Sequence, residues 1–141
     1  MDRQLDAEVA LRLAGAEQRY TRLRRDLVQV MAAAGRPLTT PEILEASPGL
    51  SQSSAYRNLS VLVTAGVARR VSGADDHGRF ELAEDLAGHH HHIVCSACGK
   101  VADIAPSPRL ERALDEAARA ATGFEVVEHR FDLVGVCAEC R

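Results

Sequence analysis

The cysteines of this 141-residue chain restrict its fold more than any other feature, because all four fall into two C-x-x-C pairs. Cys95 is paired with Cys98 and Cys137 with Cys140, and residues 99–136 separate the two pairs. In a reducing compartment such thiolate pairs favour tetrahedral Zn²⁺ over a disulfide, with a redox dithiol or an iron–sulfur centre as alternatives. We predict a structural zinc site that fixes the end of the chain to a hairpin at the first pair.

Four consecutive histidines, His89 to His92, directly precede the first cysteine pair. Successive side chains of an extended strand face opposite sides. His90 and His92 would therefore share one face, and His89 and His91 the other. This alternation predicts two separate metal sites with two imidazoles each, and a solvated polar tract is the alternative.

Further ligands must come from other parts of the chain. Glu81 ends a predicted hairpin, on the same connection as the histidines. His129 has the same phase as Val127 and Phe131 in a predicted last strand, so we expect it to face inward. Taken alone, an inward-facing histidine is more often a hydrogen-bonded core residue than a metal ligand. Glu111 lies at the edge of a helical stripe, where a glutamate is usually exposed to solvent. The histidine run makes both candidates for metal ligands.

The first half of the chain has a recognisable order of elements. Residues 23–34 form an apolar helical stripe, Thr40 is the expected N-cap of a short helix, and a third helix begins at Ser51 or Ser53. Residues 67–82 predict a hairpin. Helix, short helix, turn, helix and hairpin is the order of a winged helix-turn-helix, although other small helical domains share it.

The second half predicts strands around one helix. Residues 85–88 form a short connection, and strands follow around residues 93–94 and 101–104. A helix spans 107–123, and a last strand runs from 124 to 136. The expected fold class is α+β, an N-terminal winged helix-turn-helix domain plus a C-terminal α+β domain. A unit of roughly 50 residues has a marginal core without a metal or a partner subunit.

Charge is distributed unevenly, although the net charge is only −3. Residues 1–74 hold ten arginines against seven acidic residues, whereas residues 75–141 hold seven basic against thirteen acidic residues. This favours a polyanion-binding module fused to a second unit, although the excess is small. The apolar runs are too short to cross a bilayer and the N-terminus does not look like a signal peptide. We therefore expect a cytoplasmic protein without a membrane partner.

The start of the third helix carries the candidate DNA contacts Ser53, Ser54, Tyr56 and Arg57. Serine hydroxyls can donate to phosphate, arginine can bind guanine or the backbone, and tyrosine can contact a thymine methyl or a phosphate. A second basic group lies near the start of the first strong helix and consists of Arg19, Arg22, Arg24 and Arg25. It could contact DNA, but an ordinary polar helix face explains it at least as well.

Together these motifs resemble the ferric uptake regulator family, which covers zinc, iron, manganese, nickel and peroxide sensors. The matching segments are residues 54–59 (SAYRNL), 65–66 (AG), 79–82 (RFEL), 89–92 (HHHH), 95–100 (CSACGK) and 135–140 (GVCAEC). The resemblance spans about residues 20–141 and implies a homodimer. Each chain would have a winged-helix DNA-binding domain (1–83), a hinge (84–88) and a metal-binding dimerisation domain (89–141).

The resemblance also implies roles for individual residues. It makes Cys95, Cys98, Cys137 and Cys140 the structural zinc site; Glu81, His90 and His92 the regulatory site; and His89, His91, Glu111 and His129 an additional site. Two features depart from the family pattern. Residues 35–39 lack the histidine usual in iron and peroxide sensors, and residues 83–85 lack the cysteine frequent in zinc sensors. The fourth regulatory ligand therefore stays open, with His77 and Asp103 as candidates.

The sequence thus predicts a metal-dependent transcriptional repressor that controls metal homeostasis or a metal-dependent peroxide response. A divalent metal at the hinge would close the dimer onto a palindromic DNA operator. Glu81 and the missing hinge cysteine favour Fe²⁺, followed by Zn²⁺, and Mn²⁺ and Ni²⁺ are compatible. A zinc hydrolase or deaminase and an iron–sulfur or rubredoxin-like electron carrier are the alternatives. The chain lacks H-E-x-x-H and H-x-E followed by P-C-x-x-C, so we expect no enzyme.

Overall fold

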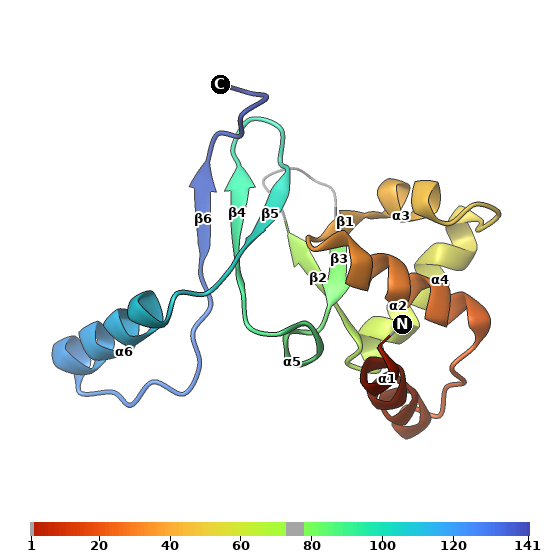
Figure 1. Cartoon of the computed structure of the whole chain (residues 1–141), viewed down its shortest axis with the longest axis horizontal. Helices are drawn as coiled ribbons and strands as arrows, with labels where there is room; N and C mark the ends of the chain where they lie inside the picture. Colours follow the sequence, from red (N-terminus) through yellow and green to blue (C-terminus); the bar gives the residue numbers. More distant parts are fainter. Residues whose placement is uncertain (1, 73–77) are drawn as a thin grey trace.

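A computed structural model describes residues 2–72 and 78–141, and within these ranges the chain forms two three-stranded sheets (Figure 1). The first sheet has the strand order β1-β3-β2 and the second β5-β4-β6. Elements of the first part are α1 (Arg3–Gly15), α2 (Arg22–Ala34), β1 (Leu38–Thr39), α3 (Thr40–Ala46), α4 (Gln52–Thr64), β2 (Ala68–Ser72) and β3 (Gly78–Leu82). The second part consists of α5 (Glu84–Ala87), β4 (His91–Cys95), β5 (Val101–Ile104), α6 (Pro108–Thr122) and β6 (Asp132–Gly135).

Side-chain caps explain where several helices begin. Thr21, Ser51 and Ser107 each accept a hydrogen bond from a backbone N–H in the first turn of α2, α4 and α6. The N-cap of α3 is Thr39, not Thr40 as expected from the sequence. The Thr39 hydroxyl accepts from the Glu42 N–H, and a Glu42 carboxylate oxygen accepts from the Thr39 N–H at 2.8 Å. This reciprocal pair is a capping box, and it makes Thr39 the N-cap, so that Thr40 becomes the first residue of the helix.

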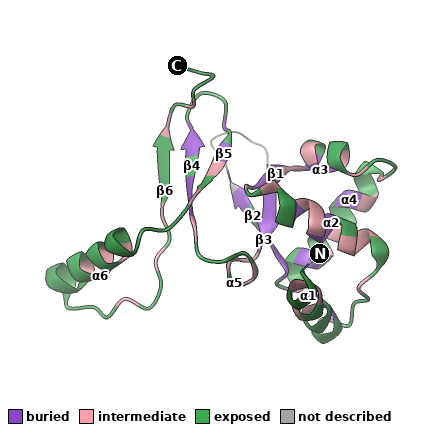
Figure 2. Ribbon diagram, in the orientation of Figure 1, coloured by how far each residue is buried: buried purple, intermediate pink, exposed green. Residues whose placement is uncertain are grey.

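The first sheet and its helices enclose the hydrophobic core. Its buried members are Val9, Leu13, Leu27, Val28, Met31, Leu38, Ile43, Leu59, Leu62, Val67, Ala68, Phe80 and Leu82. Figure 2 shows buried residues gathered in this part of the molecule, whereas α6 and β6 are mostly exposed. The helix-turn-helix pair α3 and α4 and the β2–β3 hairpin are therefore positioned by one apolar core, as the winged-helix prediction requires.

Several sequence expectations were wrong or incomplete. Helix α1 was not predicted, and residues 85–88 fall largely in the single helical turn α5 rather than a plain connection. Val63, expected on the buried stripe of α4, is 37% exposed. The last strand covers only Asp132–Gly135, because residues 124–131 have no strand partner and are irregular.

The central strand of the second sheet is β4. It pairs antiparallel with β5, as predicted for a hairpin, and parallel with β6. Figure 1 shows α6 in the crossover between β5 and β6, to the side of the sheet. None of the helices among the described residues has the length and apolar character needed to span a bilayer.

Candidate metal centres

Among the residues that the structure describes, three groups of metal-ligand side chains lie in the second half of the molecule and at its junction with the first. In each group the potential ligand atoms all lie within 4.8 Å of one another. We call them the cysteine cluster (Cys95, Cys98, Cys137, Cys140), the inter-sheet cluster (Glu81, His90, His92, Asp103) and the α6 cluster (His89, His91, Glu111, His129).

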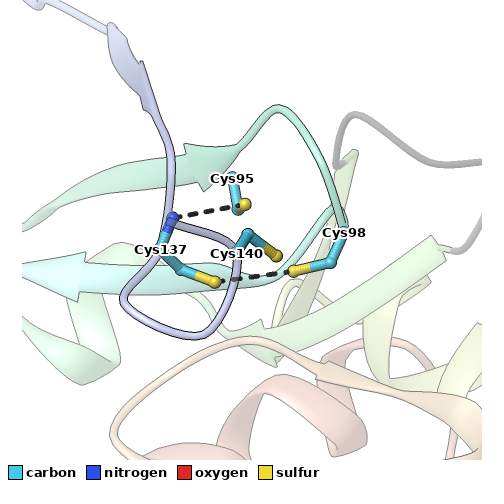
Figure 3. Close-up of side chains that lie close together, drawn as sticks. All are labelled: Cys95, Cys98, Cys137 and Cys140. Atoms are coloured by element: carbon cyan, nitrogen blue, oxygen red, sulfur yellow. Dashed lines mark hydrogen bonds between the residues drawn. The ribbon is translucent and has the colours of Figure 1, made fainter.

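Two chain segments far apart in the sequence form the cysteine cluster (Figure 3). Cys95 ends β4 and Cys98 lies in the turn that follows, while Cys137 and Cys140 come after β6. The parallel pairing of β4 with β6 places Cys95 opposite Gly135 and so brings the two pairs together. The Sγ atoms of Cys98 and Cys137 are 3.8 Å apart, too far for a disulfide. This separation matches the edge of a thiolate tetrahedron with metal–sulfur distances of about 2.3 Å, so the four residues fit Zn²⁺.

Acidities within the cysteine cluster differ strongly. Backbone N–H groups of Cys137, Cys98 and Ala97 donate to Cys95 Sγ and lower the pKa of this thiol to about 6. The neighbouring sulfurs of Cys137 and Cys98 raise the pKa of Cys140 to about 12. One thiolate is thus favoured by the backbone, whereas the full set of four needs the positive charge of a metal ion.

The inter-sheet cluster joins the two sheets. Glu81 comes from β3, His92 from β4 and Asp103 from β5, and His90 immediately precedes β4. Oε2 of Glu81 lies 3.1 Å from Nε2 of His90 and 3.2 Å from Nε2 of His92. An Asp103 oxygen lies 3.6 Å from Nε2 of His92. Two imidazole nitrogens and two carboxylates that converge in this way form a donor set for a divalent transition metal.

Outer contacts orient the imidazoles of the inter-sheet cluster. Nδ1 of His90 lies 2.8 Å from the carbonyl oxygen of Gly88, and Nδ1 of His92 lies 3.4 Å from a carboxylate oxygen of Asp132. An imidazole whose Nδ1–H donates in this way presents its Nε2 lone pair to a metal. Both Nε2 atoms face Glu81, so the rings are already turned toward a shared ligand position.

Burial and charge act against each other at Glu81. Burial disfavours its ionised form, but hydrogen bonds with His92 and Arg69 outweigh burial and lower the pKa of Glu81 to about 2. The Glu81 carboxylate in turn raises the pKa of His92. Burial is the main cause that raises the pKa of Asp103. The cluster therefore holds an ionised Glu81 in a largely water-excluded position.

One carboxylate organises the α6 cluster. Glu111, in the first turn of α6, has its oxygens 3.1 Å from Nε2 of His89, 2.6 Å from Nε2 of His91 and 2.5 Å from Nε2 of His129. The His91 ring also stacks on Phe131, with the ring centroids 4.1 Å apart. Three imidazole nitrogens and a carboxylate are a further donor set that suits Zn²⁺ and its neighbours.

The histidine run divides between the two clusters as strand alternation predicts, with His90 and His92 in one and His89 and His91 in the other. Asp103 joins the inter-sheet cluster, whereas His77 lies outside the described residues. The argument from phase for His129 was wrong, because this residue is in an irregular segment and its neighbour Val127 is 94% exposed. His129 nevertheless reaches Glu111.

The predicted DNA contacts lie at the start of α4. Ser53, Tyr56 and Arg57 are exposed, and Tyr56 is 49% exposed. Ser54 is half-buried, and its carbonyl oxygen accepts from the Asn58 side chain at 2.9 Å. The outward-facing residues form a polar surface at the N-terminus of this helix.

Part of the second basic group has structural contacts. Arg24 donates to Oδ1 of Asn58 at 3.0 Å and to the carbonyl oxygen of Arg19 at 2.6 Å. The Arg25 guanidinium lies over the Tyr20 ring, 4.7 Å from its centroid. Both arginines therefore have contacts within the chain, and a role of the group in DNA binding stays a prediction.

Sequence reasoning missed three residues near the junction of the two halves, and two of them contact the clusters. Arg69 on β2 donates to Glu81, and Glu84 at the start of α5 contacts His89. Arg12 on α1 donates to both carboxylate oxygens of Asp85. The predicted hairpin could have indicated that Arg69 lies opposite Glu81, but this requires the register of β2 against β3, which the sequence does not give.

Comparisons with known proteins agree with this architecture. The model of the family described as "Ferric uptake regulator family" matches residues 15–134. The peroxide-responsive repressor PerR of Staphylococcus epidermidis is 31% identical, over 100% of this chain and 93% of that protein. Helicobacter pylori Fur, which has three functional metal-binding sites, superimposes with a TM-score of 0.77 at 23% identity, over 97% of this chain and 91% of that one. A zinc-bound manganese uptake regulator has a TM-score of 0.72 at 26% identity, over 94% of this chain and 98% of that one.

Proposed function

This chain belongs to the ferric uptake regulator family, and we propose that it is a metal-responsive transcriptional repressor whose regulatory ligands are the residues of the inter-sheet cluster. The cysteine cluster is its structural zinc site, and the α6 cluster is an additional metal site. The repressor controls metal homeostasis or a metal-dependent peroxide response.

One observation carries the proposal: ligands from both sheets converge on one position. Glu81 belongs to the first sheet, whose β2–β3 hairpin is the wing of the winged helix, whereas His92 and Asp103 belong to the second sheet. A divalent cation supplies the positive charge that allows both carboxylates and the imidazoles to share this position. Because the ligands hold the two sheets in one relative orientation, they also fix where α4 lies in each chain of a dimer.

A second copy of the chain is the partner that we propose for the exposed side of the C-terminal part. Large apolar side chains are exposed there: Ile93, Leu110, Phe124, Val127, Leu133, Val134 and Val136. An interface between subunits would remove apolar side chains of this kind from water. In a twofold dimer, two α4 helices can occupy successive major grooves of a palindromic operator. We place the repressor in the cytoplasm, where it meets chromosomal DNA, and assign it no enzymatic activity.

The test uses DNA chosen by the protein itself. A duplex is selected from a random library with the zinc-loaded wild type in the presence of Fe²⁺ or Mn²⁺, and its affinity is then measured by fluorescence anisotropy with and without the divalent ion. We expect the ion to increase affinity about 10- to 100-fold, a usual range for coupling between two sites. The double substitution His90→Ala with His92→Ala should abolish this increase while sedimentation still shows a dimer.

A matched control removes two imidazoles from the other cluster. The double substitution His89→Ala with His129→Ala should leave the metal response of DNA affinity within about twofold of the wild type. A full response in the His90/His92 variant would refute the assignment, and a lost response only in the control would transfer the regulatory role to the α6 cluster.

A further inference from the structure

One charged side chain touches the inter-sheet cluster without being a potential ligand. Arg69 lies directly opposite Glu81 in the antiparallel pairing of β2 with β3. Its Nε donates to Oε1 of Glu81 at 2.6 Å. Glu81 is only 5% exposed, so little water competes with this bond. Charge-assisted hydrogen bonds of this length are among the strongest in proteins.

The two oxygens of Glu81 consequently have different surroundings. Oε2 lies 3.1 Å from Nε2 of His90 and 3.2 Å from Nε2 of His92. Oε1 also lies 3.1 Å from Nε2 of His92, but it accepts the hydrogen bond from Arg69 as well. Oε2 therefore faces both imidazoles, whereas one lone pair of Oε1 is already used by the hydrogen bond from Arg69.

A second carboxylate lies near the Arg69 guanidinium. Nη1 of Arg69 lies 3.8 Å from Oε2 of Glu84, and the other oxygen of Glu84 contacts His89. The Arg69 side chain is 31% exposed and lies between the carboxylates of β3 and α5. Its position is thus fixed by the strand register, by Glu81 and by Glu84, rather than by one flexible contact.

We propose that Arg69 is a positioning residue that restricts Glu81 to one ligand oxygen and so makes the inter-sheet cluster prefer Zn²⁺ over Mn²⁺. The inference rests on the proposed function, because it requires that the cluster bind a divalent metal. With one oxygen from Glu81, the cluster offers four donors, the number that Zn²⁺ prefers. A carboxylate that binds through both oxygens raises the number of donors, which suits Mn²⁺ better.

The substitution Arg69→Met tests this role, because methionine keeps the aliphatic stem and removes the donor and the charge. Dissociation constants for Mn²⁺ and Zn²⁺ are measured by chelator competition in the full-length chain with zinc at the cysteine cluster. All variants carry His89→Ala with His129→Ala, so that the inter-sheet cluster is the site that titrates. We expect R69M to bind Mn²⁺ about tenfold more tightly, because Oε1 is released and a nearby positive charge is removed. Zn²⁺ binding should change less.

A spectroscopic readout distinguishes positioning from general structural support. Co²⁺ in a four-coordinate site absorbs visible light strongly, and the absorption weakens when the coordination number rises. The Co²⁺ spectrum of R69M should therefore be weaker than that of the background chain. R69K, which keeps a cation beside Oε1, should retain the spectrum and the Zn²⁺/Mn²⁺ ratio. R70M is the matched control, since Arg70 is exposed on the same strand and should change neither.

Each outcome decides a separate question. The role of Arg69 is refuted if R69M leaves the ratio and the spectrum unchanged, or if it weakens both ions equally. If R69M does not fold, R69Q carries the same test. His90→Ala is titrated in parallel: unchanged metal affinity in that variant refutes the proposed regulatory site itself. Lost affinity in His90→Ala together with an unaltered R69M refutes only the role of Arg69.

Discussion

The β1-β3-β2 sheet packs against helices whose buried side chains are mostly apolar, whereas the β5-β4-β6 sheet buries few apolar side chains and gathers metal-ligand residues instead. Among the described residues beyond Leu82, the buried apolar side chains are Val94, Cys95 and Val101. A unit of roughly 50 residues is only marginally stable on hydrophobic burial alone. The two regions therefore differ in what they gather: the first has a hydrophobic core, and the second has clusters of metal-ligand residues and exposed apolar side chains.

The strongest way to break this comparison is to remove the structural metal. Cys95→Ser, or a strong chelator on the wild type, should destabilise the second sheet by an amount on the order of 10 kcal/mol, the scale of structural zinc binding. Hydrogen exchange by mass spectrometry should then show loss of protection in residues 91–135, while residues 9–82 stay protected. Retained protection in both parts would contradict a structural role for the cysteine cluster.

A cavity in the core of the first part should destabilise that part and leave the second sheet and its zinc unaffected. Leu59 is fully buried, so Leu59→Ala should lower the free energy of unfolding by about 3 kcal/mol without releasing zinc or dissociating the dimer. Leu110 on α6 is 43% exposed and serves as the matched control. Leu110→Ala should leave the first core intact and weaken dimerisation, as measured by sedimentation. Equal effects of both substitutions on unfolding would remove the distinction between the two halves.

The smallest expected effect concerns the contact that links the two halves through α1 and α5. Arg12 donates to Oδ1 and Oδ2 of Asp85 at 3.1 and 2.6 Å, and also to the carbonyl oxygen of Gly66 at 2.7 Å. Because Asp85 is exposed, Asp85→Asn should cost only about 0.5 kcal/mol at pH 7. Thermal unfolding followed by circular dichroism would detect this as a small shift in Tm.

The stability that Asp85→Asn removes should depend on pH in a defined direction. The hydrogen bond from Arg12 lowers the pKa of Asp85 below its ordinary value. Its stabilising contribution is therefore complete above the ordinary pKa of aspartate, about 4, and is lost as the pH falls from there toward the lowered value. The difference in Tm between wild type and Asp85→Asn should shrink below about pH 4. A difference that grows on acidification would contradict the ion pair.

Local signals predicted much of the fold. Helices α2, α4 and α6 have a capping residue at the start and an apolar stripe, so their positions could be read without tertiary information. Helix α1 was missed because its apolar residues do not form one stripe: Val9 and Leu13 are buried, whereas Leu11 is 69% exposed. The length of β6 depends on its pairing with β4, which no local pattern records.

The clusters show the same division between local and tertiary information. Alternation along an extended segment was sufficient to separate His90 and His92 from His89 and His91. Arg69 could not be predicted, because its role depends on the register that places it opposite Glu81. The contact between Glu84 and His89 arises from the turn of chain around α5, which the sequence did not reveal.

The central place of β4 also has a consequence for synthesis on the ribosome. The core members lie within residues 9–82, so their contacts become available early in translation. The strand that completes the second sheet, Asp132–Gly135, and the last two cysteines emerge only after all of these core residues. A nascent chain can therefore form the core of its DNA-facing part before its cysteine cluster is complete, and capture of zinc by all four cysteines must wait until Cys140 has emerged.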